Sequence, residues 1–112
     1  MSTDESRLTK SQLETLRRRL EEERSRILGV LQAAAMTPPD DQEREVEEAA
    51  QRATERAHQV EIAERERALL GEVERALAKF GSGTYGVSET TGDPIPYARL
   101  AAVPWARQGV DE

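Results

Sequence analysis

The side chains in this chain that could do chemistry are mainly carboxylates, and most of the excess negative charge lies in one short stretch. Residues 40–55 hold seven acidic and two basic side chains, and the whole chain has a net charge of −6. Glu45 and Glu48 are three positions apart, so on a helix they share one face. Such a pair can meet a basic protein surface or a metal ion, although most acidic runs are solvated helix faces.

The other reactive residue types are not arranged for catalysis. His58 is the only histidine, and Ser88 has no histidine or lysine arrangement that would activate its hydroxyl. Cysteine is absent, which excludes disulfides and thiolate metal ligands. Direct binding to nucleic acid is not expected either, because an acidic protein lacks the attraction to phosphates that drives it. We therefore expect a protein that acts by binding another protein, and not an enzyme.

Two long helices are predicted to position the acidic stretch. Thr9 and Gln12 have the spacing of a capping box, which predicts the start of the first helix. Thr37-Pro38-Pro39-Asp40 ends it, because a proline disfavours helical backbone in the residue before it. Between these signals the apolar residues follow a heptad spacing as far as Met36, at Leu13, Leu16, Leu20, Ile27, Leu31 and Ala34.

The second helix is predicted over residues 42–80, with Gly81 just after its end. Because a short turn joins the helices, they must be antiparallel neighbours. The sequence thus predicts an all-α dominated fold, a long antiparallel coiled-coil hairpin over residues 9–80 with its tip near 37–50. The seam of the second helix is apolar and rich in alanine toward the tip, at Val46, Ala49, Ala50, Ala53, Ala57, Val60, Ala63, Leu70, Val73, Leu77 and Phe80.

The C-terminal residues 81–112 are expected to form a small head with a short β-hairpin and a helical turn over 98–102. A unit of this size needs support from the hairpin base. Residues 1–8 are expected to be flexible and lack the apolar core of a signal peptide, and no apolar run could span a membrane. We expect a monomer in the cytoplasm. The predicted head core is Tyr85, Val87, Ile95, Tyr97, Leu100, Val103 and Trp105.

The segment from Gly83 to Leu100 resembles the zinc-finger signature of the DksA/TraR family of bacterial transcription regulators. The family pattern Gly-x-[Tyr/Phe]-Gly-x-Cys-x-x-Cys-Gly-x-x-Ile corresponds to residues 83–95, and Arg99-Leu100 and Ala102-Val103-Pro104 occupy the places of the later Arg-Leu and Ala-x-Pro. The four family cysteines fall on Ser88, Thr91, Gly109 and Glu112. Because these residues cannot build a tetrahedral zinc site, we expect a zinc-finger-like head without zinc and no other cofactor.

The resemblance also implies a function for the acidic stretch. The family tip pattern Asp-x-x-Asp-x-Ala falls on Glu45, Glu48 and Ala50. It implies that the hairpin enters the secondary channel of RNA polymerase, where the tip modulates initiation as in the stringent response. Whether ppGpp acts at the polymerase interface stays open. Two alternatives also stay open: a Gre-like accessory factor for transcript cleavage, whose paired acids help to hold Mg²⁺, and a structural coiled-coil adaptor.

Overall fold

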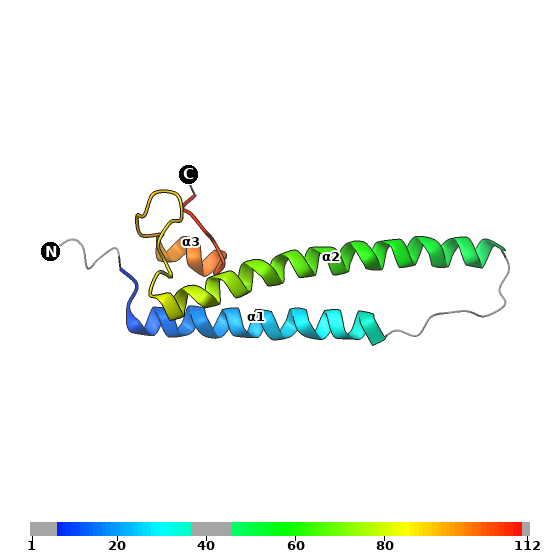
Figure 1. Cartoon of the computed structure of the whole chain (residues 1–112), viewed down its shortest axis with the longest axis horizontal. Helices are drawn as coiled ribbons and strands as arrows, with labels where there is room; N and C mark the ends of the chain where they lie inside the picture. Colours follow the sequence, from blue (N-terminus) through cyan, green and yellow to red (C-terminus); the bar gives the residue numbers. More distant parts are fainter. Residues whose placement is uncertain (1–6, 37–45, 111–112) are drawn as a thin grey trace.

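The structure is a computed structural model that describes residues 7–36 and 46–110. Helix α1 spans Lys10–Met36, α2 spans Val46–Ser82 and the short α3 spans Tyr97–Ala102. α1 and α2 lie side by side in opposite directions, and the C-terminal segment folds against their base (Figure 1). The molecule measures 71 × 25 × 20 Å. The predicted helical hairpin is therefore confirmed.

The first turn of α1 forms the predicted capping box. The Gln12 amide N–H donates to Thr9 Oγ1 over 3.0 Å, and the Thr9 N–H donates to Gln12 Oε1 over 2.9 Å. These two bonds occupy helix-end groups that would otherwise need water. Leu8, just before the cap, packs against the head, so this start ties the N-terminal segment to the C-terminal one.

The seam between the long helices is closed in the half nearer to the head. Leu16, Leu20 and Ile27 of α1 are fully buried, as the heptad spacing predicted. From α2 the buried residues are Ala63, Val73 and Ala76, whereas the predicted seam residue Leu77 is partly buried beside Ala76. Ion pairs cross the seam edges from Arg24 to Glu74 and from Arg26 to Glu66, between the two antiparallel helices.

The seam is open in the half nearer to the tip, although several residues there were predicted to belong to it. Ala49, Ala53 and Ala57 are exposed, and Val60 keeps 51% of its surface in solvent. The reason is the register, because Ala34 near the end of α1 lies beside Gln59 and Ala63. The first turns of α2 therefore extend past the end of α1.

α2 ends two residues later than predicted. The residue with left-handed backbone is Gly83, at φ 76°, and Gly81 is still helical. The Thr84 N–H donates to the Lys79 carbonyl over 2.9 Å, which is the longer bond of a Schellman motif. Either glycine fits the sequence pattern of a residue just after a helix. The hydrogen bond from Thr84 to Lys79 shows that Gly83 has this role.

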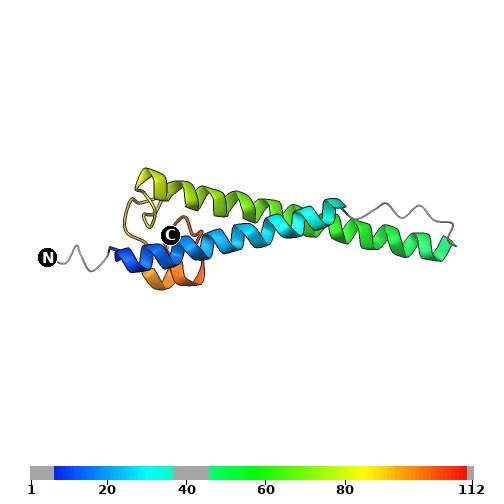
Figure 2. The same ribbon diagram turned by 90° about the horizontal axis from the view of Figure 1, so that it is seen from below.

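The head contains less β structure than predicted. Within residues 83–110 the expected short β-hairpin is a single antiparallel bridge between Val87 and Pro94. Pro94 and Pro96 have no amide hydrogen, so neither can donate to a ladder. The expected helical turn is present as α3, and it lies beside the start of α1 (Figure 2).

The head core is completed by the hairpin. Ile95 and Leu100 are buried against Leu16 of α1. The Tyr85 ring stacks on Phe80 at 4.1 Å between centroids, and its hydroxyl donates to the Pro104 carbonyl over 2.8 Å. Burial raises the pKa of Tyr85 to about 12. Two predicted core residues are instead exposed, Val87 at 36% and Tyr97 at 37%.

No helix in the described ranges has the length and apolar composition that crossing a membrane requires.

Candidate functional site

The predicted tip residues that the structure describes lie at the end of the hairpin farthest from the head. Glu48 and Ala50 belong to the first turns of α2, and both are exposed (Figure 1). Glu45 lies outside the described residues, so its distance from Glu48 is not part of the structure. The structure thus places the described tip residues on the surface of the hairpin.

The described part of the tip does not form a metal site. No cluster of three or more His, Asp or Glu side chains that could hold a metal ion occurs within residues 7–36 and 46–110. Glu48 is the predicted tip carboxylate within these ranges, and a single carboxylate gives Mg²⁺ little more than one protein ligand.

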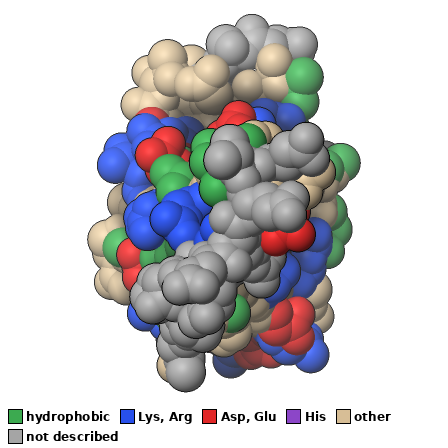
Figure 3. Space-filling model, turned by 90° about the vertical axis from the view of Figure 1, so that its right-hand side faces the viewer, with side chains coloured by type: hydrophobic (Ala, Val, Ile, Leu, Met, Phe, Trp, Pro, Cys, Tyr) green, Lys and Arg blue, Asp and Glu red, His purple; other side chains and the backbone are tan. Residues whose placement is uncertain are grey.

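An apolar groove with arginines at its rim lies on the tip half of the hairpin. It has a volume of about 380 Å³, and Leu31, Ala34 and Val60 line it together with Arg56 and Arg67. Figure 3, which views the molecule from the tip end, shows hydrophobic and basic side chains next to one another. The sequence analysis missed this groove, because it depends on where α1 ends relative to α2.

These two arginines differ from those near the head. Arg24 and Arg75 form ion pairs with glutamates, whereas Arg56 and Arg67 form none with the residues that the structure describes. Apolar surface combined with arginine is typical of protein-protein interfaces. The tip half is therefore the part of the hairpin best suited to receive a protein partner.

The positions that resemble zinc ligands form hydrogen-bonded turns. Ser88 is buried, and its Oγ accepts hydrogen bonds from the N–H groups of Thr90 and Thr91 over 3.1 and 3.2 Å. Thr91 Oγ1 accepts from the Asp93 N–H over 3.2 Å, and Gly109 has no side chain. Glu112 lies outside the described residues. Hydroxyls already engaged with backbone amides, and a glycine, do not fit the thiolate and imidazole ligands of a structural zinc site.

A carboxylate that the sequence analysis did not single out connects the head to α2. Glu89 accepts two hydrogen bonds from Arg75, over 2.8 and 2.6 Å, and lies 2.6 Å from Lys79 Nζ. These two cations lower the pKa of Glu89 to about 2, Arg75 contributing most. Arg107 likewise donates to Glu72 over 2.7 Å and lowers the pKa of that carboxyl. We call these contacts the head clamp; no local sequence pattern predicts them, since its members lie 10 to 35 positions apart.

No family model matches the chain, but comparison with known proteins gives several relatives in sequence. The chain is 53% identical to general stress protein 16O of Bacillus subtilis, and 40% identical to the RNA polymerase-binding transcription factor DksA of Caulobacter vibrioides, each over 58 residues. Each match covers 52% of this chain but only 36% and 41% of the two relatives, so the matched segment spans about two fifths of their length.

Two solved structures resemble most of the chain. The transcription factor DksA2 from Pseudomonas aeruginosa superposes with a TM-score of 0.67 at 28% identity, over 91% of this chain and 80% of that one. The RNA polymerase binding protein and transcriptional regulator Dks from Chlamydia trachomatis superposes with a TM-score of 0.58 at 24% identity, over 94% and 86% of the two chains. The second similarity concerns the fold alone.

Proposed function

We propose, from its similarity to DksA proteins in sequence and fold, that the chain is a transcription regulator of the DksA/TraR family that binds RNA polymerase. The hairpin enters the secondary channel of the polymerase, and the head stays at the channel entrance. The observation that carries this proposal is the exposed tip half, a narrow two-helix projection that places Glu48 and an arginine-rimmed apolar groove far from the head.

The proposed action of the tip is contact, without catalysis by this chain. Glu45 and Glu48 supply carboxylates to the basic interior of the channel, and Ala50 lets the helix approach closely there. Such contacts change the stability of the open promoter complex and so modulate initiation. The proposal includes ppGpp as a second effector at the polymerase interface. It further takes the protein to act as a cytoplasmic monomer that needs no zinc.

A polymerase binding assay tests the first step. The intact protein should be retained by RNA polymerase, and replacing Val60 and Arg67 together (V60S/R67Q) should weaken retention about tenfold or more, because buried interface groups of this kind contribute the most binding energy. The matched control is Glu64→Gln, an exposed residue of α2 outside the groove. A complete lack of retention of the intact protein would reject the proposed function.

In vitro transcription at a ribosomal promoter tests the tip itself. The double variant Glu45→Ala/Glu48→Ala should bind polymerase and fail to change open-complex lifetime, whereas Glu64→Ala should act like the natural sequence. Each reaction is run with and without ppGpp, and an effect that is independent of ppGpp would remove it from the proposal. If the tip variant alters lifetime as strongly as the natural protein, the tip carboxylates have no part in the mechanism.

A further inference from the structure

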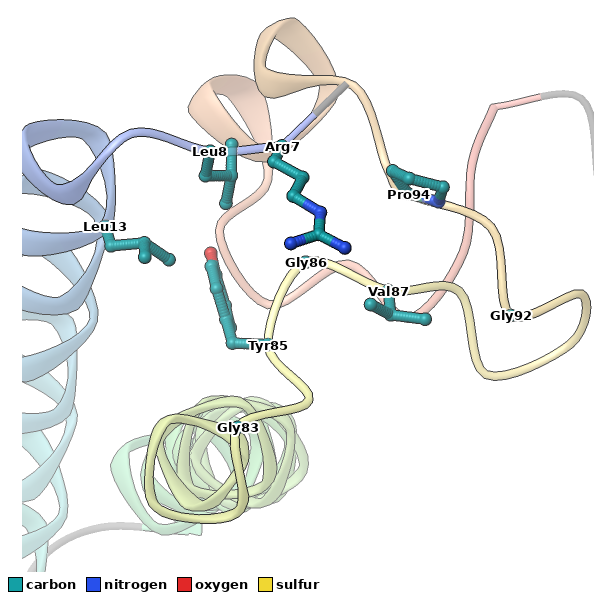
Figure 4. Close-up of a pocket in the computed structure, with 9 residues that line it drawn as sticks. All are labelled: Arg7, Leu8, Leu13, Gly83, Tyr85, Gly86, Val87, Gly92 and Pro94. Atoms are coloured by element: carbon teal, nitrogen blue, oxygen red, sulfur yellow. The ribbon is translucent and has the colours of Figure 1, made fainter. Parts of the chain in front are cut away.

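A cavity lies at the opposite end of the molecule from the tip, between the N-terminal segment and the head. It has a volume of about 470 Å³, within the range of small-molecule sites. Arg7, Leu8 and Leu13 form one wall, and head residues between Gly83 and Pro94 form the other (Figure 4). The cavity is not part of the tip surface through which the protein is proposed to act.

Half of the head residues that line this cavity are glycines. Gly83, Gly86 and Gly92 all have left-handed backbone, at φ 76°, 88° and 78°, and all three line the cavity. Residues with a Cβ are strained at such angles. A Cβ on Gly83 or Gly92 would meet no atom within 4 Å, so both glycines leave open space beside them. A ligand can therefore approach the peptide groups of this wall closely.

Among the described residues that line the cavity, Arg7 is the one with a charged side chain. Figure 4 shows the Arg7 side chain extending over the cavity toward Gly86 and Val87. Within residues 7–36 and 46–110 Arg7 takes part in no ion pair, although the arginines of the head clamp, Arg75 and Arg107, are both paired. Its five N–H donors are thus available to a carboxylate, which a guanidinium binds through two parallel hydrogen bonds.

We propose that this cavity binds a small monocarboxylic acid with an apolar body. The carboxylate pairs with Arg7, and the apolar body lies against Leu8, Leu13 and Pro94. One cation balances one negative charge, so a polyphosphate would leave most of its charge unpaired. The negative charge of Asp93, which lies between two lining residues, disfavours polyanions further. The ligand class is therefore a free aromatic or branched aliphatic carboxylate.

Amide chemical shifts of the ¹⁵N-labelled full chain test the proposal, because the glycine signals report on the cavity wall directly. Titration with benzoate should shift the amides of Gly83, Gly86 and Gly92 and reach saturation. Benzamide has the same shape without charge, and acetate has the charge without the ring, so each should bind at least severalfold more weakly. Inorganic phosphate should not compete with benzoate at equal concentration. Equal affinity for benzoate and benzamide, or shifts that never saturate, would overturn the proposal.

Substitution of Arg7 provides a second test of the proposal. Arg7→Gln should weaken benzoate binding about tenfold, which is the contribution of one charge-assisted pair. The matched control is Arg18→Gln, an exposed arginine of α1 outside the cavity, which should bind benzoate with unchanged affinity. Unperturbed amide signals from the hairpin establish that either variant is folded. If Arg7→Gln binds benzoate as well as the natural chain does, Arg7 is not the carboxylate partner. Polymerase binding by both variants should be unchanged, so failure here leaves the proposed function standing.

Discussion

The head clamp predicts that replacing Glu89 destabilises the protein in a pH-dependent way. Glu89 is held by Arg75 and Lys79, and Glu89→Gln removes the charge while keeping the shape of the side chain. The glutamine still offers a carbonyl oxygen, so the variant tests the ionic contribution and not the loss of packing. Its effect should be confined to the contact between the head and α2.

The magnitude follows from the pKa. A pKa lowered from 4.5 to about 2 sets an upper limit of roughly 3 kcal/mol on the stabilisation, at about 1.4 kcal/mol per unit. The Glu89 side chain is 25% exposed, and Arg75 is 49% exposed. Since water screens such pairs, we discount the limit to about 1–2 kcal/mol at neutral pH. For a chain of this size that is a loss of roughly 4–8 °C in Tm.

The pH dependence has a definite sign. The pKa of Glu89 is lower in the folded chain than in the unfolded one, so its stabilisation is fully present above pH 4.5. It decreases as the pH falls from 4.5 and is lost when the pH passes about 2, where the folded carboxylate takes up its proton. The difference in Tm between the natural chain and Glu89→Gln should therefore be constant from pH 8 to pH 5 and shrink below pH 4.

Thermal unfolding followed by two signals checks this prediction. Circular dichroism reports the helices, and the fluorescence of Trp105 reports the head, because Trp105 is the only tryptophan and packs where the head meets the hairpin. The control is Glu55→Gln, an exposed glutamate near the tip that forms no ion pair with described residues. If Glu89→Gln melts at the same temperature as Glu55→Gln at pH 7, or if the gap persists unchanged at pH 3, the clamp does not stabilise the head.

Three further predictions follow from the packing and the turns. Metal analysis of the purified protein should find no stoichiometric zinc, and a chelator should leave Tm unchanged. Ser88→Ala should lower the free energy of unfolding in urea by about 1–2 kcal/mol, because two amide groups of a buried turn lose their acceptor; Ser88→Cys without metal should recover little of it. Leu20→Ala should cost about 2–4 kcal/mol, whereas Val60→Ala should cost under about 0.5 kcal/mol because Val60 is half-exposed; equal losses would mean that the seam is closed at the tip.

The helical hairpin could be predicted because its signals are local. The capping bonds of Thr9 and Gln12 involve neighbours in sequence, and the burial of Leu16 and Leu20 follows from a heptad spacing within one helix. The exposure of Val60 could not be predicted in the same way. It depends on where the end of α1 falls along α2, and that register results from the packing of both helices with the head.

The same distinction between local and long-range signals applies to the candidate site. Glu48 and Ala50 were found through a sequence pattern, and the structure gives them an exposed helix end. The outward position of Tyr97 was missed, because an apolar residue beside prolines has no periodicity to indicate its direction. The pairing of Glu89 with Arg75 was missed. Glu89 lies between Ser88 and Thr91, two positions where the family pattern has cysteines, and nothing in the local sequence connects its charge with Arg75.

If the head binds no metal, as proposed, the clamp explains what holds it against the hairpin instead. The two segments that carry the degenerate ligand positions are joined by a hydrogen bond from the Glu89 N–H to the Arg107 carbonyl and by another between the side chains of Thr90 and Gln108. Each such bond contributes only about 1 kcal/mol, and each clamp ion pair a similar amount. A bound structural metal ion is a single crosslink, and its removal unfolds a small domain completely. When several weak contacts stabilise the head instead, each substitution should lower the free energy of unfolding by a partial and additive amount. No single substitution in the clamp should therefore detach the head while Ile95 and Leu100 stay buried against Leu16.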